Sequence, residues 1–286
     1  MKLLILGGTG LLGSKLKDYC DLYGFSCSTV ARQNSTFNID LLADDALMHI
    51  FDAVKPTHVI NAFALTNLTF CEENEHHAKK AHIDTVQNLS LLSAEMGFKF
   101  IHISTDQVYD NSFDSGSKET DPLSFKNIYV KTKIEGEKHV LSDGLILRTA
   151  FLGKRLVGPM SLSDYYFSVI EQNLKAKIFN DVYSSALDVS TLCELILRSI
   201  QEDLCGVYNV GTSSPYLKSE LFDRLCANLN LQVDNIEYGP CNLVPIRNKN
   251  CGLNCDKIRT ALNLKLPTLE QVCEKLIREA RDGLCT

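Results

Sequence analysis

The chain has 286 residues, of which 45% are hydrophobic and 22% charged, and 29 basic against 35 acidic side chains give a net charge of -6. This composition is typical of a globular enzyme, and the lack of a basic stripe argues against a nucleic-acid partner. The longest apolar runs are no longer than a strand, which argues against a membrane span. Eleven cysteines without paired short spacing predict reduced thiols in a cytoplasmic protein and no metal site.

Strands and helices alternate through the first half of the chain. Short apolar runs predict strands at 2–6, 25–31, 57–63, 99–104 and 144–149. Apolar residues at helical spacing predict helices at 11–22, 44–54, 72–96 and 127–141. This alternation predicts an α/β fold, a doubly wound parallel sheet of the Rossmann type with helices on both faces.

After residue 150 the alternation becomes irregular. Helical patterns at 162–174, 188–201, 217–228, 255–262 and 268–282 are mixed with short strands at 176–180, 206–210 and 234–238. We therefore predict a dinucleotide-binding domain over 1–150, with 181–204 packing on it, and a smaller mixed α/β substrate-binding region over 151–286. The absence of a low-complexity linker predicts that the two parts pack closely.

Three glycines, Gly7, Gly10 and Gly13, follow the first predicted strand at a spacing of three. Between a strand and a helix, such glycines allow a tight turn, a close approach of backbone to a pyrophosphate, and close packing of helix on strand. Near the end of the second strand Arg32 occupies the place where an acidic residue would hold a ribose 2′-hydroxyl. Because a guanidinium suits a 2′-phosphate, NADPH is predicted over NADH.

Tyr129 and Lys133 are four residues apart in a predicted helix, so they share one face. Such a pair also occurs by chance on solvated helices, but Thr105 lies at the end of the fourth strand, at the sheet edge where doubly wound folds bind ligands. We expect Thr105 to donate to a carbonyl oxygen and Tyr129 to protonate it while a nicotinamide supplies hydride. Lys133 is expected to lower the Tyr129 pKa from about 10 and to bond the nicotinamide ribose.

Four segments resemble the extended short-chain dehydrogenase/reductases, and most closely the dTDP-4-dehydrorhamnose reductase family: GGTGLLG at 7–13, VINAFALT at 59–66, HISTDQVYD at 102–110 and YVKTKIEGE at 129–137. Pro245 and the stretch 253–258 look like that family's C-terminal signature. The resemblance implies the catalytic residues Thr105, Tyr129 and Lys133. It also implies homodimers, and a cofactor site made of Gly7, Thr9, Gly10, Leu11, Leu12, Gly13, Arg32, Asp40, Leu41, Asn61, Ala62, Ala64, Tyr129 and Lys133.

The chain departs from the pattern of that family at three places, and from the pattern of related dehydratases at a fourth. His82 replaces a helix asparagine that is linked to the proton relay. Gln107 stands where related dehydratases place a glutamate, and because glutamine cannot remove a carbon-bound proton, dehydration is disfavoured. Phe151 replaces a tryptophan near the sugar, and Val244 an arginine before Pro245. The substrate-contacting residues are expected to be Thr105, Asp106, Gln107 and Phe151.

These observations favour an NADPH-dependent reductase acting on the 4-keto group of a nucleotide-linked 4-keto-6-deoxy sugar, for deoxysugar and surface polysaccharide biosynthesis. One alternative is an epimerase or epimerase-reductase, for which His82 or Cys71 would supply the extra acid or base. Another is a non-catalytic binding subunit on the same scaffold, similar to the regulatory subunit of methionine adenosyltransferase. Such a subunit need not keep Thr105, Tyr129 and Lys133, and this chain has all three.

Overall fold

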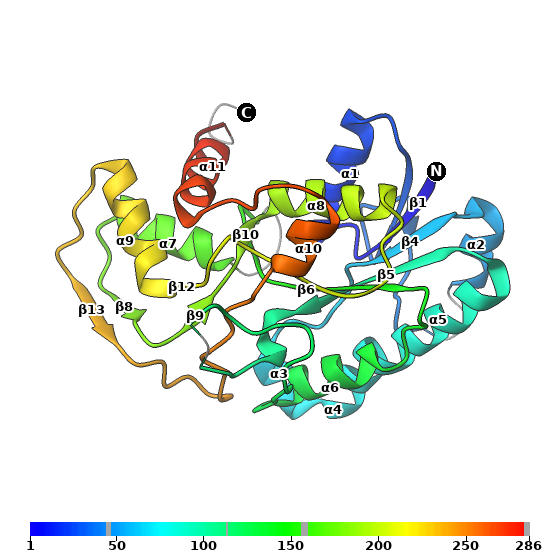
Figure 1. The fold of residues 1–286 in the computed structure, drawn as a ribbon, viewed down its shortest axis with the longest axis horizontal. Helices are drawn as coiled ribbons and strands as arrows, with labels where there is room; N and C mark the ends of the chain where they lie inside the picture. Colours follow the sequence, from blue (N-terminus) through cyan, green and yellow to red (C-terminus); the bar gives the residue numbers. More distant parts are fainter. Residues whose placement is uncertain (44–46, 113, 156–159, 283–286) are drawn as a thin grey trace.

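The centre of the molecule is a seven-stranded parallel sheet of order β11-β6-β5-β4-β1-β2-β3 (Figure 1). The structure, a computed structural model, describes all residues except 44–46, 113, 156–159 and 283–286. The sheet strands are β1 (Lys2–Leu6), β2 (Ser26–Ala31), β3 (Phe37–Asn38), β4 (His58–Asn61), β5 (Lys99–Thr105), β6 (Leu145–Thr149) and β11 (Gly206–Val210). The predicted doubly wound α/β fold is confirmed.

Side chains of a strand point alternately to opposite faces of the sheet, and here helices cover both faces, so both are buried. In β1, Leu3 and Ile5 join one hydrophobic core, whereas Leu4 and Leu6 join the other. Helices α1 (Leu11–Leu22) and α8 (Val189–Gln201) contribute to the first core, and α2 (Met48–Val54) and α5 (Thr85–Met96) to the second. Figure 1 shows α1 and α8 above the strands and α5 and α6 (Ile128–Glu137) below them.

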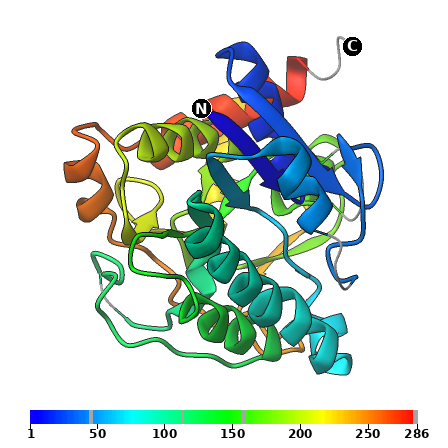
Figure 2. The ribbon, with the colours of Figure 1, turned by 90° about the vertical axis from the view of Figure 1, so that its right-hand side faces the viewer.

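The prediction of a single long helix over 72–96 is wrong. It consists of α3 (Leu68–Glu73), α4 (Glu75–Lys79), a π-helical turn (Lys80–Asp84) and α5. Asn74 interrupts it with non-helical backbone angles, φ -133° and ψ 57°. The sequence pattern does not reveal a break at one residue, because the apolar positions before and after it keep their helical spacing. Figure 2 shows α6 running beside these helices on the same side of the sheet.

Asparagine side chains start two of these helices. The Asn67 side chain accepts a hydrogen bond from the backbone N–H of Phe70, and the Asn127 side chain accepts one from Val130. Each bond satisfies an N–H group that has no partner within the helix. The cap at Asn127 sets the start of α6 and thereby the place of Tyr129. The predicted start of α2 at 44–46 lies outside the described residues.

The strand predicted at 206–210 is present. It is β11, which pairs with β6 and forms the edge of the central sheet. The tyrosine hydroxyl of Tyr19 in α1 donates to Glu194 Oε1 of α8 at 3.3 Å, so part of 181–204 contacts the first half of the chain. The division into domains at residue 150 stays a prediction.

The rest of the chain forms small sheets and helices beside the carboxyl edge of the large sheet. Three two-stranded sheets pair β7 (Phe151–Leu152) with β10 (Leu187–Asp188), β9 (Tyr183–Ser184) with β12 (Tyr216–Leu217), and β8 (Ala176–Phe179) with β13 (Ile236–Gly239). The helices are α7 (Leu162–Glu171), α9 (Lys218–Leu229), α10 (Asp256–Ala261) and α11 (Leu269–Asp282). The strands β8 and β13 match the predictions at 176–180 and 234–238. The two-residue strands β7, β9, β10 and β12 were not predicted, since two residues carry no periodic pattern.

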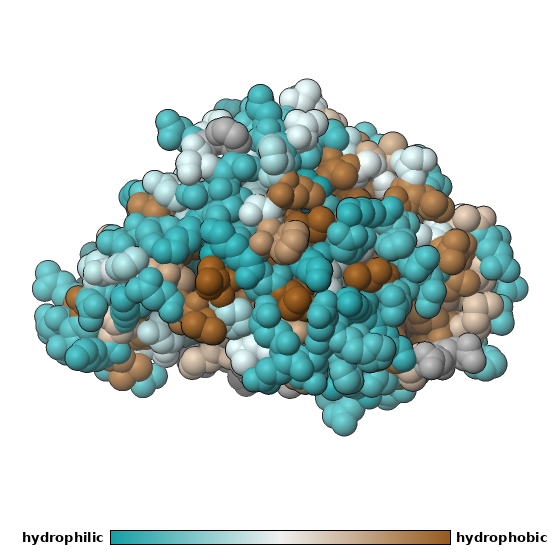
Figure 3. Space-filling model, turned by 90° about the horizontal axis from the view of Figure 1, so that it is seen from below, coloured by the Kyte–Doolittle hydropathy of each residue, from teal (hydrophilic) through white to brown (hydrophobic). Residues whose placement is uncertain are grey.

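The surface is mixed in polarity. Seen from below the view of Figure 1, hydrophobic side chains form separate patches between hydrophilic ones (Figure 3). Within the described ranges, no helix combines the length and apolar character needed to cross a bilayer. No group of three or more His, Cys, Asp or Glu side chains suited to a metal ion occurs in that same part of the chain.

Candidate active site

The glycine turn between β1 and α1 is closed by backbone contacts that leave no space for a Cβ atom at Gly7 or Gly13. Gly7 has φ +84°, a conformation that glycine adopts without strain. A Cβ atom on Gly13 would lie 2.2 Å from the Gly7 carbonyl oxygen, so α1 packs directly on the turn. The N-cap residue Gly10 makes no side-chain cap, which leaves the first N–H groups of α1 to a ligand. This arrangement fits a dinucleotide pyrophosphate.

A cavity of about 270 Å³ opens beside this turn. Ten of the residues predicted to bind a cofactor line it, namely Gly7, Thr9, Gly10, Leu11, Leu12, Arg32, Asp40, Leu41, Ala62 and Ala64. Residues of β2, the loop after β3 and the loop after β4 thus meet at one place, because parallel strands end at the same sheet edge. The assignment of these residues to a cofactor stays a prediction.

Asn61, unlike Ala62 and Ala64, is not among the residues that line this cavity. Its side chain is fully buried and accepts a hydrogen bond from the backbone N–H of Phe63 at 3.2 Å. Its amide nitrogen lies 3.3 Å from His102 Nδ1. Asn61 therefore supports the loop that lines the cavity through hydrogen bonds to protein groups.

Thr105 and Tyr129 come together at the carboxyl end of β5. Thr105 is the last residue of that strand, and its side chain lies close enough to the Tyr129 phenol to influence its pKa. The Thr105 hydroxyl also accepts from the backbone N–H of Gln107 at 3.2 Å, which holds it in place. The predicted pairing of a hydroxyl and a phenol is thus present, although neither side chain is among the described residues that line the cavities of this site.

Burial raises the pKa of Tyr129, and the neighbouring Thr105 side chain offsets only part of that effect. This direction is opposite to the lowering that was expected from Lys133. Instead, the Lys133 ammonium group reaches β5, where Nζ donates to the Ile103 carbonyl at 2.8 Å and lies 3.2 Å from His102 Nε2. A phenol with a raised pKa keeps its proton at neutral pH and gives it up only to an oxygen that develops negative charge.

Lys133 is itself shifted by its surroundings. Burial lowers the pKa of Lys133 to about 8, and the nearby Glu137 carboxylate opposes the shift. Only 1% of the side chain is exposed. Lys133 therefore lies in the protein interior, against β5.

Asp106 and Gln107 follow Thr105 in a short 3-10 turn. Asp106 is buried, and burial raises the pKa of its carboxyl to about 6, against the opposing effect of the Lys218 ammonium. The Gln107 side chain donates to Cys251 Sγ at 3.1 Å. This contact, 144 residues away in the sequence, fixes the amide at the wall of a second cavity.

The second cavity has a volume of about 340 Å³ and adjoins the first. Thr66 and Phe151 line both cavities. The other lining residues are Leu68, Gln107, Phe179, Val182, Lys218, Cys241, Arg247 and Asn248. An apolar wall with two cationic side chains suits a molecule that has both an apolar surface and negative charge. Of the predicted substrate residues, Gln107 and Phe151 contribute directly to this wall.

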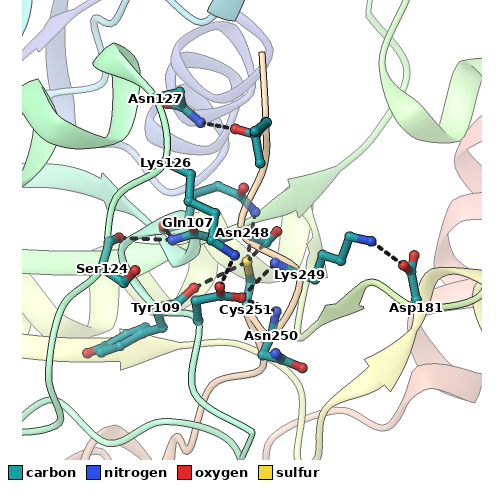
Figure 4. Close-up of polar contacts among 12 residues, drawn as sticks. Gln107, Tyr109, Ser124, Lys126, Asn127, Asp181, Asn248, Lys249, Asn250 and Cys251 are labelled. Atoms are coloured by element: carbon teal, nitrogen blue, oxygen red, sulfur yellow. Dashed lines mark hydrogen bonds and ion pairs between the residues drawn. The ribbon is translucent and has the colours of Figure 1, made fainter. Parts of the chain in front are cut away.

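The segment 246–251 is held against the site by polar contacts (Figure 4). The Asn248 side chain donates to the carbonyl oxygens of Gln107 at 2.7 Å and Ser124 at 2.9 Å. The backbone N–H groups of Lys249 and Asn250 both donate to Asp110 Oδ1, at 2.9 and 3.0 Å. Lys249 also pairs with Asp181. These contacts place Arg247 at the cavity.

Sequence reasoning missed Lys218, Arg247 and Asn248. Val244 lacks the positive charge expected before Pro245, but Arg247 supplies one three residues later. Its Nε atom is buried and has no hydrogen-bond partner within the described structure. A buried guanidinium nitrogen without a partner is costly, and an anionic ligand would satisfy it. The basic residues after Pro245 were the available signal.

Comparisons with known proteins agree with this geometry. The RmlD substrate binding domain model matches residues 1–281. The dTDP-4-dehydrorhamnose reductase of Salmonella typhimurium is 24% identical over 298 residues, covering 98% of this chain and 98% of that protein. Methionine adenosyltransferase 2 subunit beta of Bos taurus is 25% identical over 276 residues, covering 91% of this chain and 82% of that protein.

A solved structure has the same fold. The crystal structure of the Bacillus anthracis dTDP-4-dehydrorhamnose reductase in complex with NADP matches with a TM-score of 0.88 and 21% identity, covering 98% of this chain and 100% of that one. The predicted family resemblance is confirmed. Because the family model extends over almost the whole chain, this protein belongs to the RmlD substrate binding domain family.

Proposed function

We propose that this protein is an NADPH-dependent reductase of the 4-keto group of a nucleotide-linked 4-keto-6-deoxy sugar. The observation that carries the proposal is the pairing of the Thr105 and Tyr129 side chains at the sheet edge where two cavities adjoin. A ketone reductase needs a dinucleotide and a substrate side by side, with a proton donor next to both.

The residues of the chain fit a bound NADPH. The glycine turn and the start of α1 would hold the pyrophosphate, and Arg32, which lines the cavity, would pair with the 2′-phosphate. A bound nicotinamide supplies a hydride to the substrate carbon. Tyr129 holds the proton for the carbonyl oxygen, while the Thr105 hydroxyl orients that oxygen. Lys133 contributes positive charge at β5, one helical turn after Tyr129 in α6.

The substrate would occupy the second cavity. Its sugar ring would pack on Phe151 and Phe179, and its diphosphate would reach Lys218 and Arg247. Gln107 has no basic group, which supports reduction over dehydration. The product would be an activated deoxysugar, as required for surface polysaccharides, and we propose that the enzyme works in the cytoplasm as a homodimer. Light scattering of the purified protein measures the oligomeric state.

Oxidation of NADPH, followed by absorbance with dTDP-4-keto-6-deoxy sugars, tests this function. We expect turnover, and a lower KM for NADPH than for NADH because of Arg32. Absence of turnover with every nucleotide-linked 4-keto sugar would refute the reductase proposal. Equal KM values for the two cofactors would refute the role of Arg32.

The similarity to methionine adenosyltransferase 2 subunit beta supports a second candidate function, a binding subunit of another enzyme. Such a subunit would need no proton donor. If a Tyr129→Phe variant supported the same sugar-nucleotide levels in the cell as the wild type, this alternative would be favoured over the reductase.

A further inference from the structure

His82 is a buried histidine for which the reductase chemistry provides no role. It lies in the π-helical turn Lys80–Asp84, between α4 and α5, and only 1% of it is exposed. Single π-turns inside helices occur frequently at functional sites.

Both ring nitrogens have protein partners. The backbone N–H of Leu65 donates to Nε2 at 3.0 Å, and because a backbone N–H can only donate, Nε2 carries no proton. The proton is therefore on Nδ1, which lies 2.8 Å from the Thr132 hydroxyl oxygen. That hydroxyl in turn donates to the Ile128 carbonyl at 2.9 Å. The tautomer follows from the direction of each bond.

The histidine stays neutral under working conditions. Burial lowers the pKa of His82 to about 3, and the Lys133 ammonium acts in the same direction. Neutral imidazole offers one donor and one acceptor, and both are used by Thr132 and Leu65. No ring nitrogen is left to bind the water of a proton relay.

The two partners of His82 belong to the two halves of the site. Leu65 lines the dinucleotide cavity, whereas Thr132 belongs to α6, next to Lys133. The His82 ring also meets the Tyr129 ring edge to face, with centroids 5.4 Å apart and an interplanar angle of 88°. A Cβ atom on Gly136 would lie 2.0 Å from the His82 carbonyl oxygen, so α6 and the π-turn touch through their backbones.

We propose that His82 is a positioning residue, which fixes the Tyr129 phenol relative to the dinucleotide cavity by joining Leu65 to α6. The inference rests on the proposed reductase function. The position of the phenol matters, because displacement of a proton donor by about 1 Å lowers the reaction rate on the order of 100-fold.

His82→Phe tests the proposal, because phenylalanine keeps the ring but loses both hydrogen bonds. We expect kcat to fall about 10- to 100-fold and the Kd of NADPH, measured by calorimetry, to rise several-fold. The pH profile of kcat should keep its position, since no titrating group is removed. His49→Phe, at an exposed histidine of α2, is the matched control and should change neither value.

A second variant guards against a folding defect. Thr132→Val removes the Nδ1 acceptor at nearly constant volume, together with the bond from the same hydroxyl to the Ile128 carbonyl within α6. We expect a fall in kcat of about fivefold, consistent with the loss of the one hydrogen bond that links α6 to His82. Because both changes break the same link, His82→Phe with Thr132→Val should be no worse than His82→Phe alone. Thermal unfolding of each variant measures its stability.

Three results would overturn the proposal. One is a His82→Phe enzyme with wild-type kcat and NADPH affinity. Another is a full multiplication of the two kcat losses in the double variant. The third is a shifted pH profile, or rescue of His82→Ala by added imidazole, either of which would make His82 a proton relay. Absence of turnover by the wild type would refute the reductase function itself. The effect of His82→Phe on the Kd of NADPH would still test the link between Leu65 and α6.

Discussion

The two cavities of the site are built in different ways. The dinucleotide cavity is lined mainly by loops that directly follow β1, β2, β3 and β4, within the first 66 residues. The substrate cavity combines residues from 66 to 248, which tertiary contacts bring together. In the first, the backbone of three glycines decides the shape. In the second, side-chain hydrogen bonds such as Gln107 to Cys251 decide it.

This difference determines how each cavity responds to substitution. A side chain added at the glycine turn acts through steric overlap with backbone atoms, which cannot move aside. A polar side chain removed from the substrate cavity acts through a lost contact to the ligand, while the surrounding structure persists. The first kind of change should therefore abolish cofactor binding, and the second should weaken substrate binding alone.

Gly13→Ala should have the largest effect. Its Cβ would lie 2.2 Å from the Gly7 carbonyl oxygen, whereas that of Gly10→Ala would lie 3.3 Å from the same oxygen. We expect Gly13→Ala to lose roughly 3 kcal/mol of unfolding free energy or more, together with NADPH binding. Denaturant unfolding and calorimetry measure both quantities. The control variant Gly10→Ala should fold normally, and NADPH binding by Gly13→Ala with wild-type affinity would contradict the steric argument.

Tyr129→Phe should lower kcat by about 100- to 10,000-fold, because it removes the proton donor. The Kd of NADPH should hardly change, since the ring and its contact with His82 persist. Stopped-flow and steady-state assays separate the two parameters. Tyr165→Phe, at a partly exposed tyrosine, serves as the control. If Tyr129→Phe kept half of the wild-type kcat, Tyr129 would not be the donor.

Asp106→Asn should change the pH dependence of stability. The pKa of Asp106 is raised from 3.8 to about 6, so the folded state binds this proton more tightly than the unfolded state. The wild type therefore loses stability as the pH rises from about 4 to 6, by up to about 3 kcal/mol.

The variant lacks that loss. Its unfolding free energy relative to the wild type should increase between pH 4 and 6 and be constant above, as measured by urea unfolding. Asp52→Asn at an exposed position is the control. A difference that does not vary with pH would show that the Asp106 pKa is close to its ordinary value.

Arg247→Gln should have the smallest effect of the four. We expect the KM of the nucleotide sugar to rise about tenfold, the value of one charged hydrogen bond, with kcat and the KM of NADPH unchanged. Lys177→Gln, at an exposed lysine, is the control. A change in the KM of NADPH instead would assign this cavity to the cofactor and end the distinction between the two cavities.

The sequence by itself determined the parts of the protein that depend on local backbone geometry. The α/β alternation, the glycine turn at Gly7 and the spacing of Tyr129 and Lys133 follow from the periods of strand and helix. Each of these features lies within one segment of a few residues, so its pattern is visible without the fold.

Only the tertiary structure decided which groups meet. The contacts of Lys133 with Ile103 and His102, and the cavity position of Arg247, join segments far apart in the chain. The break at Asn74 and the place of β11 in the central sheet belong here too. Burial then sets the pKa directions of Tyr129 and Asp106, because desolvation depends on all neighbours in space. A local sequence pattern does not show which residues are neighbours in space.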